Sequence, residues 1–240
     1  MPSPPTSAWT SAECTQFDQS LQALGLPSIC LMEQAANAIC GMVESTLKPI
    51  ANNTVAFLCG PGNNGADGVA AARLSLGNPD LEVYVLLLSD TIAPKSLLET
   101  HLKVFKSLGG KVHVGIENWP ELVQICPDLW VDALFGVGLM RPIEGPLSNF
   151  IASQILHNAP ILAVDCPSGL DATSGKILGT AIPATWTLSF VAPKTGFNLH
   201  HGPEYCGEVL VADIGVRGEI AKAWKANGGS FPGPIKKGLP

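Results

Sequence analysis

Most side chains in this sequence that could take part in chemistry occur in four short segments, and each segment overlaps or follows the end of an apolar run. The segments read GPGNNGADG (60–68), VDALFGVGL (131–139), VDCPSGLDATSG (164–175) and VAPKTG (191–196). Asp132 and Asp165 each close an apolar run, and Lys194 follows another. Because a carboxylate can transfer protons and stabilise a cation, a fold that joined these residues would be equipped for acid–base chemistry.

The elements that must position these residues alternate between strand-like and helix-like patterns. The central strands are apolar throughout, which is typical of a parallel sheet covered on both faces. The β-α-β rhythm predicts a doubly wound, mostly parallel α/β sheet, whose ligands bind outside the carboxyl ends of the strands. We expect strands at 54–60, 82–89, 111–115, 128–134, 160–166, 186–191 and 208–215. We expect two helices within about 8–47 and others near 67–77, 95–108, 118–125 and 146–157.

The glycine-rich loop raises the question of a dinucleotide cofactor, because glycines at 60, 62 and 65 satisfy G-x-G-x-x-G. A nicotinamide dehydrogenase would also carry an acidic residue about 20 positions later, at the end of the second strand, to bind the ribose hydroxyls. Position 85 is Val, Asp90 lies too late and Glu82 lies at the wrong strand end. Asp67 would in addition meet a bound pyrophosphate with like charge. The loop therefore favours a ligand that is held by amides and a carboxylate.

Each of these features also has a purely structural interpretation. A glycine turn can simply connect two elements, and an Asp at a strand end can cap the next helix. Lys194 by itself is more typical of a surface lysine, and His200 and His201 suggest a solvent-exposed pair. Two aspartates that reach one sheet edge together are harder to explain in this way, because burying them costs several kcal/mol without a cation or hydrogen-bond donors.

Composition narrows the class of protein. The chain has 240 residues, of which 46% are hydrophobic and 14% charged, so it forms one large domain or two small ones. A net charge of −6 argues against general nucleic-acid binding. The longest fully apolar run, VYVLLL, is too short to span a membrane, and the first residues do not read as a secretory signal. Seven cysteines without a C-x-x-C pair favour reduced thiols and a cytoplasmic protein over a disulfide framework or a zinc site.

The order and spacing of GPGNNGADG, VDALFGVGL, AVDCPSGLDATSG and APKTG resemble those of the NAD(P)H-hydrate epimerases, also called YjeF N-terminal domain proteins. LMEQAANAI before the first strand fits as well, and the resemblance covers about residues 14–215. Ala66 stands where the family usually has Gly, and Cys166 where it usually has Ile or Val. The resemblance implies one three-layer α/β/α Rossmann-like domain over residues 1–225 and a flexible C-terminal tail over 226–240.

The resemblance also implies an activity, which is interconversion of the R and S forms of hydrated NADH and NADPH (NADHX and NADPHX). Such an enzyme repairs damaged cofactor for a separate dehydratase, is often a homodimer, and uses no redox cofactor. A potassium ion is expected at Asn64, Asp132 and Ser168. Asp165 is expected to transfer the proton, oriented by Lys194 or replaced by it. The expected substrate contacts are Asn63, Asn64, Gly65, Ala66, Asp67, Gly136, Val137, Gly138, Leu139, Met140, Arg141, Pro142 and Asp165. The alternatives are a non-catalytic binding or scaffold module of the same fold and, less favoured, a nicotinamide-dependent dehydrogenase.

Overall fold

The computed structural model describes residues 8–47, 52–117, 119, 126–153 and 159–231. Its centre is a seven-stranded sheet in the order β3-β2-β1-β4-β5-β6-β7, and every neighbouring pair is parallel. All seven expected strands are confirmed. Their bounds are β1 (Asn53–Cys59), β2 (Leu81–Leu87), β3 (Lys111–Val114), β4 (Leu129–Ala133), β5 (Ile161–Val164), β6 (Trp186–Phe190) and β7 (Glu208–Ala212).

The expected helices occur close to their expected positions, and further helical segments occur where none was expected. The helices are α1 (Ser11–Ala23), α2 (Ser28–Thr46), α3 (Asn63–Ser75), α4 (Leu97–Ser107), α5 (Gly145–Ala152), α6 (Gly202–Tyr205) and α7 (Gly218–Ala226), with a 3₁₀ turn η3 (Thr195–Asn198). The helix expected at 67–77 begins four residues earlier, so Asn63 and Asn64 form its first turn. The helix expected at 118–125 and the end of the one expected at 146–157 lie outside the described residues. The segments η3, α6 and α7 were not expected.

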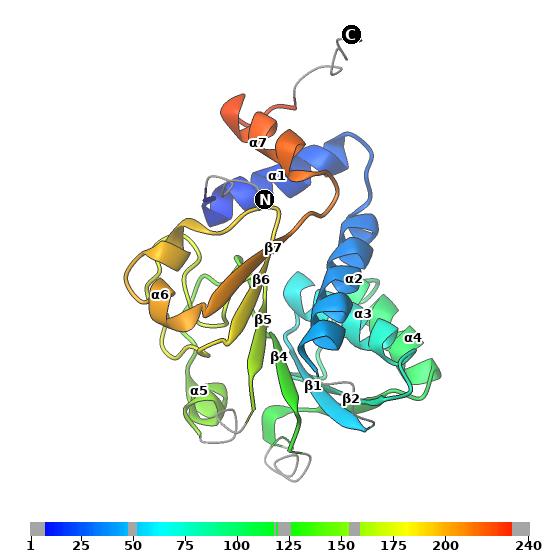
Figure 1. The fold of residues 1–240 in the computed structure, drawn as a ribbon. Coiled ribbons are helices and arrows are strands. Elements are labelled where there is room, and N and C mark those ends of the chain that lie inside the picture. Colours follow the sequence, from blue (N-terminus) through cyan, green and yellow to red (C-terminus); the bar gives the residue numbers. More distant parts are fainter. Residues whose placement is uncertain (1–7, 48–51, 118, 120–125, 154–158, 232–240) are drawn as a thin grey trace.

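Helices cover both faces of the sheet, which gives the three layers (Figure 1). On β1, Val55 and Phe57 join the core formed with α2, α3 and α4. Ala56 and Leu58 point to the other face and join the core that includes Leu147 of α5. Because alternate side chains of one strand are buried on opposite faces, the strand reads as a continuous apolar run, as a doubly covered parallel sheet requires.

The chain changes direction in the sheet between β1 and β4. β1 pairs with β2 on one side and with β4 on the other, and from β4 the sheet continues through β5, β6 and β7. Loops that leave the carboxyl ends of β1 and β4 therefore turn to opposite faces and leave a crevice between them. The four segments that carry the chemistry all begin at this edge.

Helix α1 is fixed above this edge by backbone and aromatic contacts. Trp9 donates its N–H to Pro193 O at 2.8 Å and accepts from Thr195 N at 2.8 Å, which ties the start of the chain to the loop after β6. Its ring stacks on Trp224 of α7 with centroids 5.3 Å apart. Phe231 packs against Trp224 and Phe17 of α1. The tail expected to be flexible over 226–240 is therefore packed at least as far as Phe231, and residues 232–240 lie outside the described residues.

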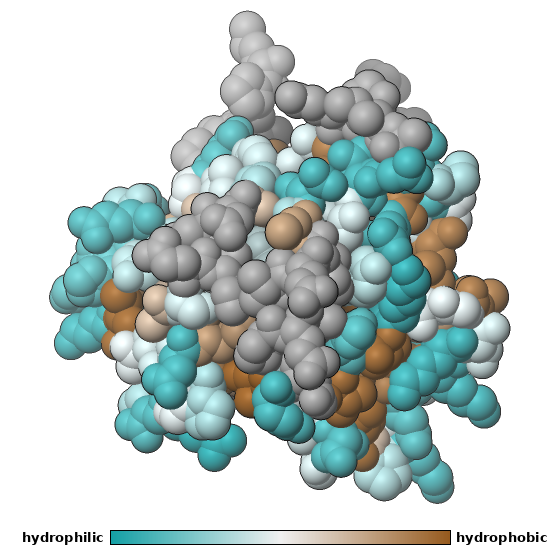
Figure 2. Space-filling view, turned by 90° about the horizontal axis from the view of Figure 1, so that it is seen from below, coloured by the Kyte–Doolittle hydropathy of each residue, from teal (hydrophilic) through white to brown (hydrophobic). Residues whose placement is uncertain are grey.

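The surface carries both hydrophilic and hydrophobic residues. Figure 2, a view from below, shows hydrophilic residues around several small apolar areas. None of the helices in the described part of the chain is both long and apolar enough to cross a membrane.

Candidate active site

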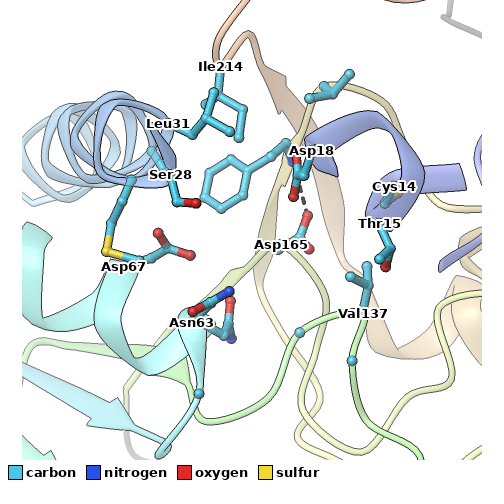
Figure 3. A pocket seen from close by; sticks show the side chains of 18 of the residues that line it. Cys14, Thr15, Asp18, Ser28, Leu31, Asn63, Asp67, Val137, Asp165 and Ile214 are labelled. Atoms are coloured by element: carbon cyan, nitrogen blue, oxygen red, sulfur yellow. Dashed lines mark hydrogen bonds between the residues drawn. The ribbon is translucent and has the colours of Figure 1, made fainter. Parts of the chain in front are cut away.

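A cavity of about 610 Å³ lies at the carboxyl edge of the sheet, beneath α1 and beside α2 and the start of α3 (Figure 3). It is lined by residues from segments far apart in the sequence, including both of the loops expected to hold a ligand. The expected site residues that line it are Asn63, Asn64, Asp67, Gly136, Val137, Gly138, Leu139, Asp165 and Lys194.

Asp165 and Lys194 form an ion pair in the wall of this cavity. Asp165 directly follows β5, and its Oδ1 lies 2.7 Å from Lys194 Nζ and accepts from Phe190 N at 3.2 Å. Nζ also donates to Phe190 O at 2.9 Å and to Ala192 O at 3.1 Å. The three protons of the ammonium therefore have three acceptors. Burial lowers the pKa of Lys194, but Asp165, Cys14 and Cys166 together outweigh burial, and the net pKa is raised. The expectation of a surface lysine was wrong, because Lys194 is fully buried.

The backbone beside this ion pair is strained. Asp165 has a φ of +64° and Val191, at the end of the neighbouring β6, has a φ of +67°. The left-handed region is uncommon for residues other than glycine, and for a β-branched residue such as Val it is a clear outlier. Strain of this kind persists only where the surrounding structure over-determines it, and it gathers at functional sites. Here the two strained residues both line the cavity.

Asp132 and Ser168 lie together beneath the cavity, and both are fully buried. Ser168 donates from Oγ to Asp132 Oδ1 at 2.6 Å and from its backbone N–H to Oδ2 at 2.8 Å. Leu134 N donates to Oδ1 at 3.3 Å. Burial raises the pKa of Asp132 to about 6 against the opposing effect of these hydrogen bonds. The three hydrogen bonds therefore offset only part of the cost of burying this charged carboxylate.

The Asn64 amide bridges the end of β5 and the loop after β4. Its nitrogen donates to Val164 O at 3.1 Å and its oxygen accepts from Gly136 N at 3.3 Å, which is the amide orientation that gives both groups a partner. A Cβ added to Gly136 would lie 3.1 Å from the Asn64 side chain and 3.4 Å from Asp165 Oδ2. Glycine at 136 therefore keeps open the space between Asn64 and Asp165.

The glycines of the first loop act mainly in packing. A Cβ on Gly65 would lie 1.8 Å from Gly60 O, and a Cβ on Gly60 would lie 1.9 Å from Leu134 O. These contacts bring the first turn of α3 close to the loop after β4. The helix's own hydrogen bonds begin with Ala66 N to Gly62 O at 3.1 Å, so the preceding N–H groups are left for other acceptors.

The comparisons with known proteins agree with one another. The sequence model of the family described as YjeF-related protein N-terminus matches residues 28–196. A protein of Weissella koreensis named NAD(P)H-hydrate epimerase is 36% identical over 88% of this chain and 92% of its own length. One of the same name from Limosilactobacillus fermentum is 35% identical over 86% and 96%. The chain belongs to the YjeF N-terminal family.

Two further comparisons place this YjeF N-terminal chain among its relatives. It spans 38% of a Salinibacter ruber protein named bifunctional NAD(P)H-hydrate repair enzyme Nnr, to which it is 34% identical. A solved structure titled yeast ynu0, YNL200c matches with a TM-score of 0.76 over 97% of each chain at 21% identity, which supports the three-layer fold.

Several residues carried over from the family motifs lie outside the cavity lining of this YjeF N-terminal chain. Met140 is 91% exposed, and Arg141 and Pro142 are exposed beside it. Gly65 and Ala66 are buried within α3. Ala66 does not have a positive φ, so a side chain at this position is tolerated. Asp132 and Ser168 lie below the cavity lining, as described above.

The interpretation as a nicotinamide dehydrogenase loses further support. β2 ends at Leu87, where a ribose-binding acid would be needed, and Val85 is buried. Asp90 is exposed three residues beyond the strand. Glu82 pairs with Lys111 near the opposite end of β2.

The sequence did not single out the residues that α1 contributes. Cys14, Thr15, Asp18, Gln19 and Gln22 all line the cavity. Three of them are spaced at positions 14, 18 and 22, one helical turn apart, on a face next to the buried Phe17 and Leu21. This spacing was visible in the sequence, but the contact between α1 and the sheet edge depends on the tertiary contacts of Trp9.

Proposed function

We propose that this chain is an NAD(P)H-hydrate epimerase that interconverts the R and S forms of hydrated NADH and NADPH. The observation that carries the proposal is the carboxylate of Asp165, which faces a ligand-sized cavity and is paired with a fully buried lysine. The Weissella koreensis and Limosilactobacillus fermentum relatives, which this chain matches over most of their length, carry the name of the same activity.

The chemistry needs an acid–base group and a way to stabilise a cation. In the hydrate, one carbon of the nicotinamide ring carries both a hydroxyl and the ring nitrogen. When the hydroxyl leaves as water, the nitrogen lone pair forms a planar iminium ion. Water then returns to the other face of this carbon and gives up a proton. A carboxylate that stays ionised can stabilise the iminium ion and accept that proton.

Lys194 contributes to this reaction by holding Asp165 in place. Its ammonium is fully hydrogen-bonded to Asp165, Phe190 and Ala192, and its side chain is only 1% exposed. It therefore orients Asp165, and Asp165 is the group that meets the substrate.

The rest of the substrate would contact the two loops that line the cavity. Free N–H groups at the start of α3 suit the oxygens of a dinucleotide, because a helix N-terminus attracts negative charge. Asp67 lies one turn into the helix, and burial, together with Asp165 and Asp18, raises its pKa well above the usual range. Protonation of Asp67 would remove the like-charge conflict with a pyrophosphate that the sequence suggested.

Asn64, Asp132 and Ser168 fit a potassium ion by their chemistry. They offer one buried carboxylate, one amide oxygen and one hydroxyl, which is too little negative charge for a dedicated divalent site. When bound, the ion would supply a fixed positive charge beside the cavity. No cluster of three His, Cys, Asp or Glu side chains suited to a metal ion occurs in the described ranges.

The product of this activity would pass to a dehydratase specific for the S form. The bifunctional name of the Salinibacter ruber relative supports such coupling. A homodimer and a cytoplasmic location are also part of this proposal.

One assay separates the three functional classes. The purified protein is given an R-enriched mixture of hydrated NADH together with an S-specific dehydratase, and recovery of NADH is followed by its absorbance. We expect recovery of the R fraction far above the rate without the protein. Recovery at the uncatalysed rate despite measurable binding would favour a binding module, and consumption of NADH with an added carbonyl substrate would favour a dehydrogenase.

A further inference from the structure

Asp18 of α1 is an acidic side chain in the cavity that no family motif includes. It is half-buried and lines the cavity, and Figure 3 shows its carboxylate beside that of Asp165. Among the residues that the structure describes, its carboxylate has no hydrogen-bond or ion-pair partner. A carboxylate that is partly buried without a partner loses hydration that nothing replaces, so its presence here needs an explanation.

The two neighbouring carboxylates have different surroundings. Asp165 is paired with Lys194 and accepts a backbone N–H, whereas Asp18 has neither kind of partner. Burial and the charge of Asp165 together raise the pKa of Asp18 to about 6, although Lys194 opposes them. Two neighbouring carboxylates with different environments are the usual arrangement for one acid and one base.

The proposed epimerisation needs one group that donates a proton and another that accepts one. The departing hydroxyl must receive a proton, and Asp165 is placed as an acceptor, because its Oδ1 already receives hydrogen bonds from Lys194 Nζ and Phe190 N. Lys194 is also a poor donor to substrate, because all three of its protons are already bonded to Asp165, Phe190 and Ala192.

We propose that Asp18 is a second catalytic carboxylate of this site, which protonates the departing hydroxyl while Asp165 accepts the proton of the incoming water. The inference rests on the proposed function and adds a residue to it.

Epimerisation then consists of the loss of one water molecule and the addition of another. Asp18 gives its proton to the hydroxyl, the C–O bond breaks with both electrons going to oxygen, and water leaves. The nitrogen lone pair forms the C=N bond of the iminium ion. Water adds to the opposite face, the C=N electrons return to nitrogen, and Asp165 accepts the proton that the water loses. Exchange with solvent then returns Asp165 to its ionised form and Asp18 to its protonated form.

The test compares Asp18→Asn, Asp18→Glu and wild type by direct measurement of R-to-S conversion, with the uncatalysed rate subtracted. The groups that face Asp18 are Asp165 from β5, Lys194 after β6, Asp67 from α3 and Cys14 on α1 itself. Of these, Asp67 is the other carboxyl group whose ionisation could lower kcat/KM as the pH rises. Asp67→Asn is therefore measured in parallel.

For the wild type, kcat/KM should fall about tenfold per pH unit above pH ~6, because the proton donor is then ionised. Asp18→Asn should lower kcat/KM at pH ~6 by roughly 10²-fold or more and abolish this descending limb, whereas Asp67→Asn should keep it. Asp18→Glu should keep the limb at a reduced rate.

A stability measurement distinguishes chemistry from packing. Asp18→Asn should raise the Tm at neutral pH, because folding then no longer buries an unpartnered charge, and a residue needed for structure would lower it. Glu13→Gln is the control on the same helix. It removes a carboxylate that caps α1 and pairs with Lys225 outside the cavity, so it should lower the Tm and keep the pH profile.

The outcomes separate the two proposals. If the wild type epimerises and Asp18→Asn keeps both its rate and its descending limb, the role of Asp18 is overturned and the proposed function stands. An equal loss of rate in Glu13→Gln and Asp18→Asn would also overturn it, because the placement of α1 would then explain both. A wild type that does not epimerise overturns the proposed function itself.

Discussion

Lys194 is buried more deeply than Asp165, although both line the cavity. Its side chain is 1% exposed and that of Asp165 is 13% exposed, with Nζ and Oδ1 2.7 Å apart. The carboxylate is therefore the more accessible of the two groups to a ligand. This asymmetry assigns the contact with substrate to Asp165 and the positioning to Lys194, and it has consequences for stability as well as for catalysis.

Lys194→Met should destabilise the fold. The change leaves the Asp165 carboxylate and two backbone carbonyls without their buried partner, and breaking a buried pair in this way typically costs about 3–5 kcal/mol. Urea unfolding of the variant and the wild type measures the difference. Lys222→Met is the control, because Lys222 pairs with the exposed Glu219 on α7, where a surface pair contributes at most about 1 kcal/mol. Equal effects of the two substitutions would contradict the structural role of Lys194.

Asp165→Asn should lower the rate of epimerisation by roughly 10²–10⁴-fold, the usual value of general acid–base catalysis. The amide keeps the shape of the side chain and removes its ability to take up a proton. Timed R-to-S conversion measures the loss, and circular dichroism checks the fold. Asp213→Asn is the matched control, since Asp213 is exposed after β7 and lines no part of the cavity. Near-full activity of Asp165→Asn would remove Asp165 from the role of proton acceptor.

The sheet was predictable because its strands are read directly from local sequence. Val55 to Leu58 are all apolar since both faces of β1 are covered, and Asp132 and Asp165 interrupt their runs where the strands end. The residues that meet at the edge therefore followed from topology. The first turn of α3 was less readable, because Asn63 and Asn64 look like loop residues until the close approach of Gly65 to Gly60 places them on a helix.

The rest of the site depended on contacts that the sequence does not encode locally. Lys194 is buried because the loop after β6 bends back, with Val191 at positive φ and Trp9 pairing with both neighbours of Lys194. Asp18 reaches the cavity because the same Trp9 anchors α1. The exposure of Met140 and its neighbours shows the opposite case, in which residues that share a motif with cavity residues turn outward.

Two glycine-to-alanine changes in helix interiors should have opposite effects on stability. A Cβ on Gly68 of α3 would lie 2.6 Å from the Ala133 Cβ and 3.0 Å from Cys59 Sγ, so Gly68→Ala should cost about 1–3 kcal/mol through overpacking. Gly41 of α2 has no atom within 4 Å of an added Cβ, so Gly41→Ala should stabilise by about 0.5–1 kcal/mol. Urea unfolding of both variants measures the signs. A loss in Gly41→Ala or a gain in Gly68→Ala would contradict the packing described for these helices.

Asn63→Ala should weaken substrate binding while leaving stability nearly unchanged. Asn63 is exposed at the mouth of the cavity in the first turn of α3, so its side chain adds little to packing. We expect KM for the hydrate to rise about tenfold or more, since a lost hydrogen bond to a charged group is worth about 1.5–3 kcal/mol. Asn37→Ala on the exposed face of α2 is the control and should leave KM unchanged. A large fall in Tm with normal KM would mean that Asn63 serves only the turn.

Potassium should stabilise the protein and support its activity through Asp132. An ion that binds the folded state at about 100 times its Kd would add about 2.7 kcal/mol to the free energy of unfolding. The Tm should therefore rise in a potassium chloride series more than in sodium chloride at equal ionic strength. Asp132→Asn should weaken the ion's binding, because it removes the one carboxylate among the three expected ligands, and its epimerase rate should recover in part at high potassium. Asp165→Asn should show no such recovery, since its defect lies in proton transfer. If the two salts had the same effect on Tm and rate, the potassium site at Asn64, Asp132 and Ser168 would be wrong.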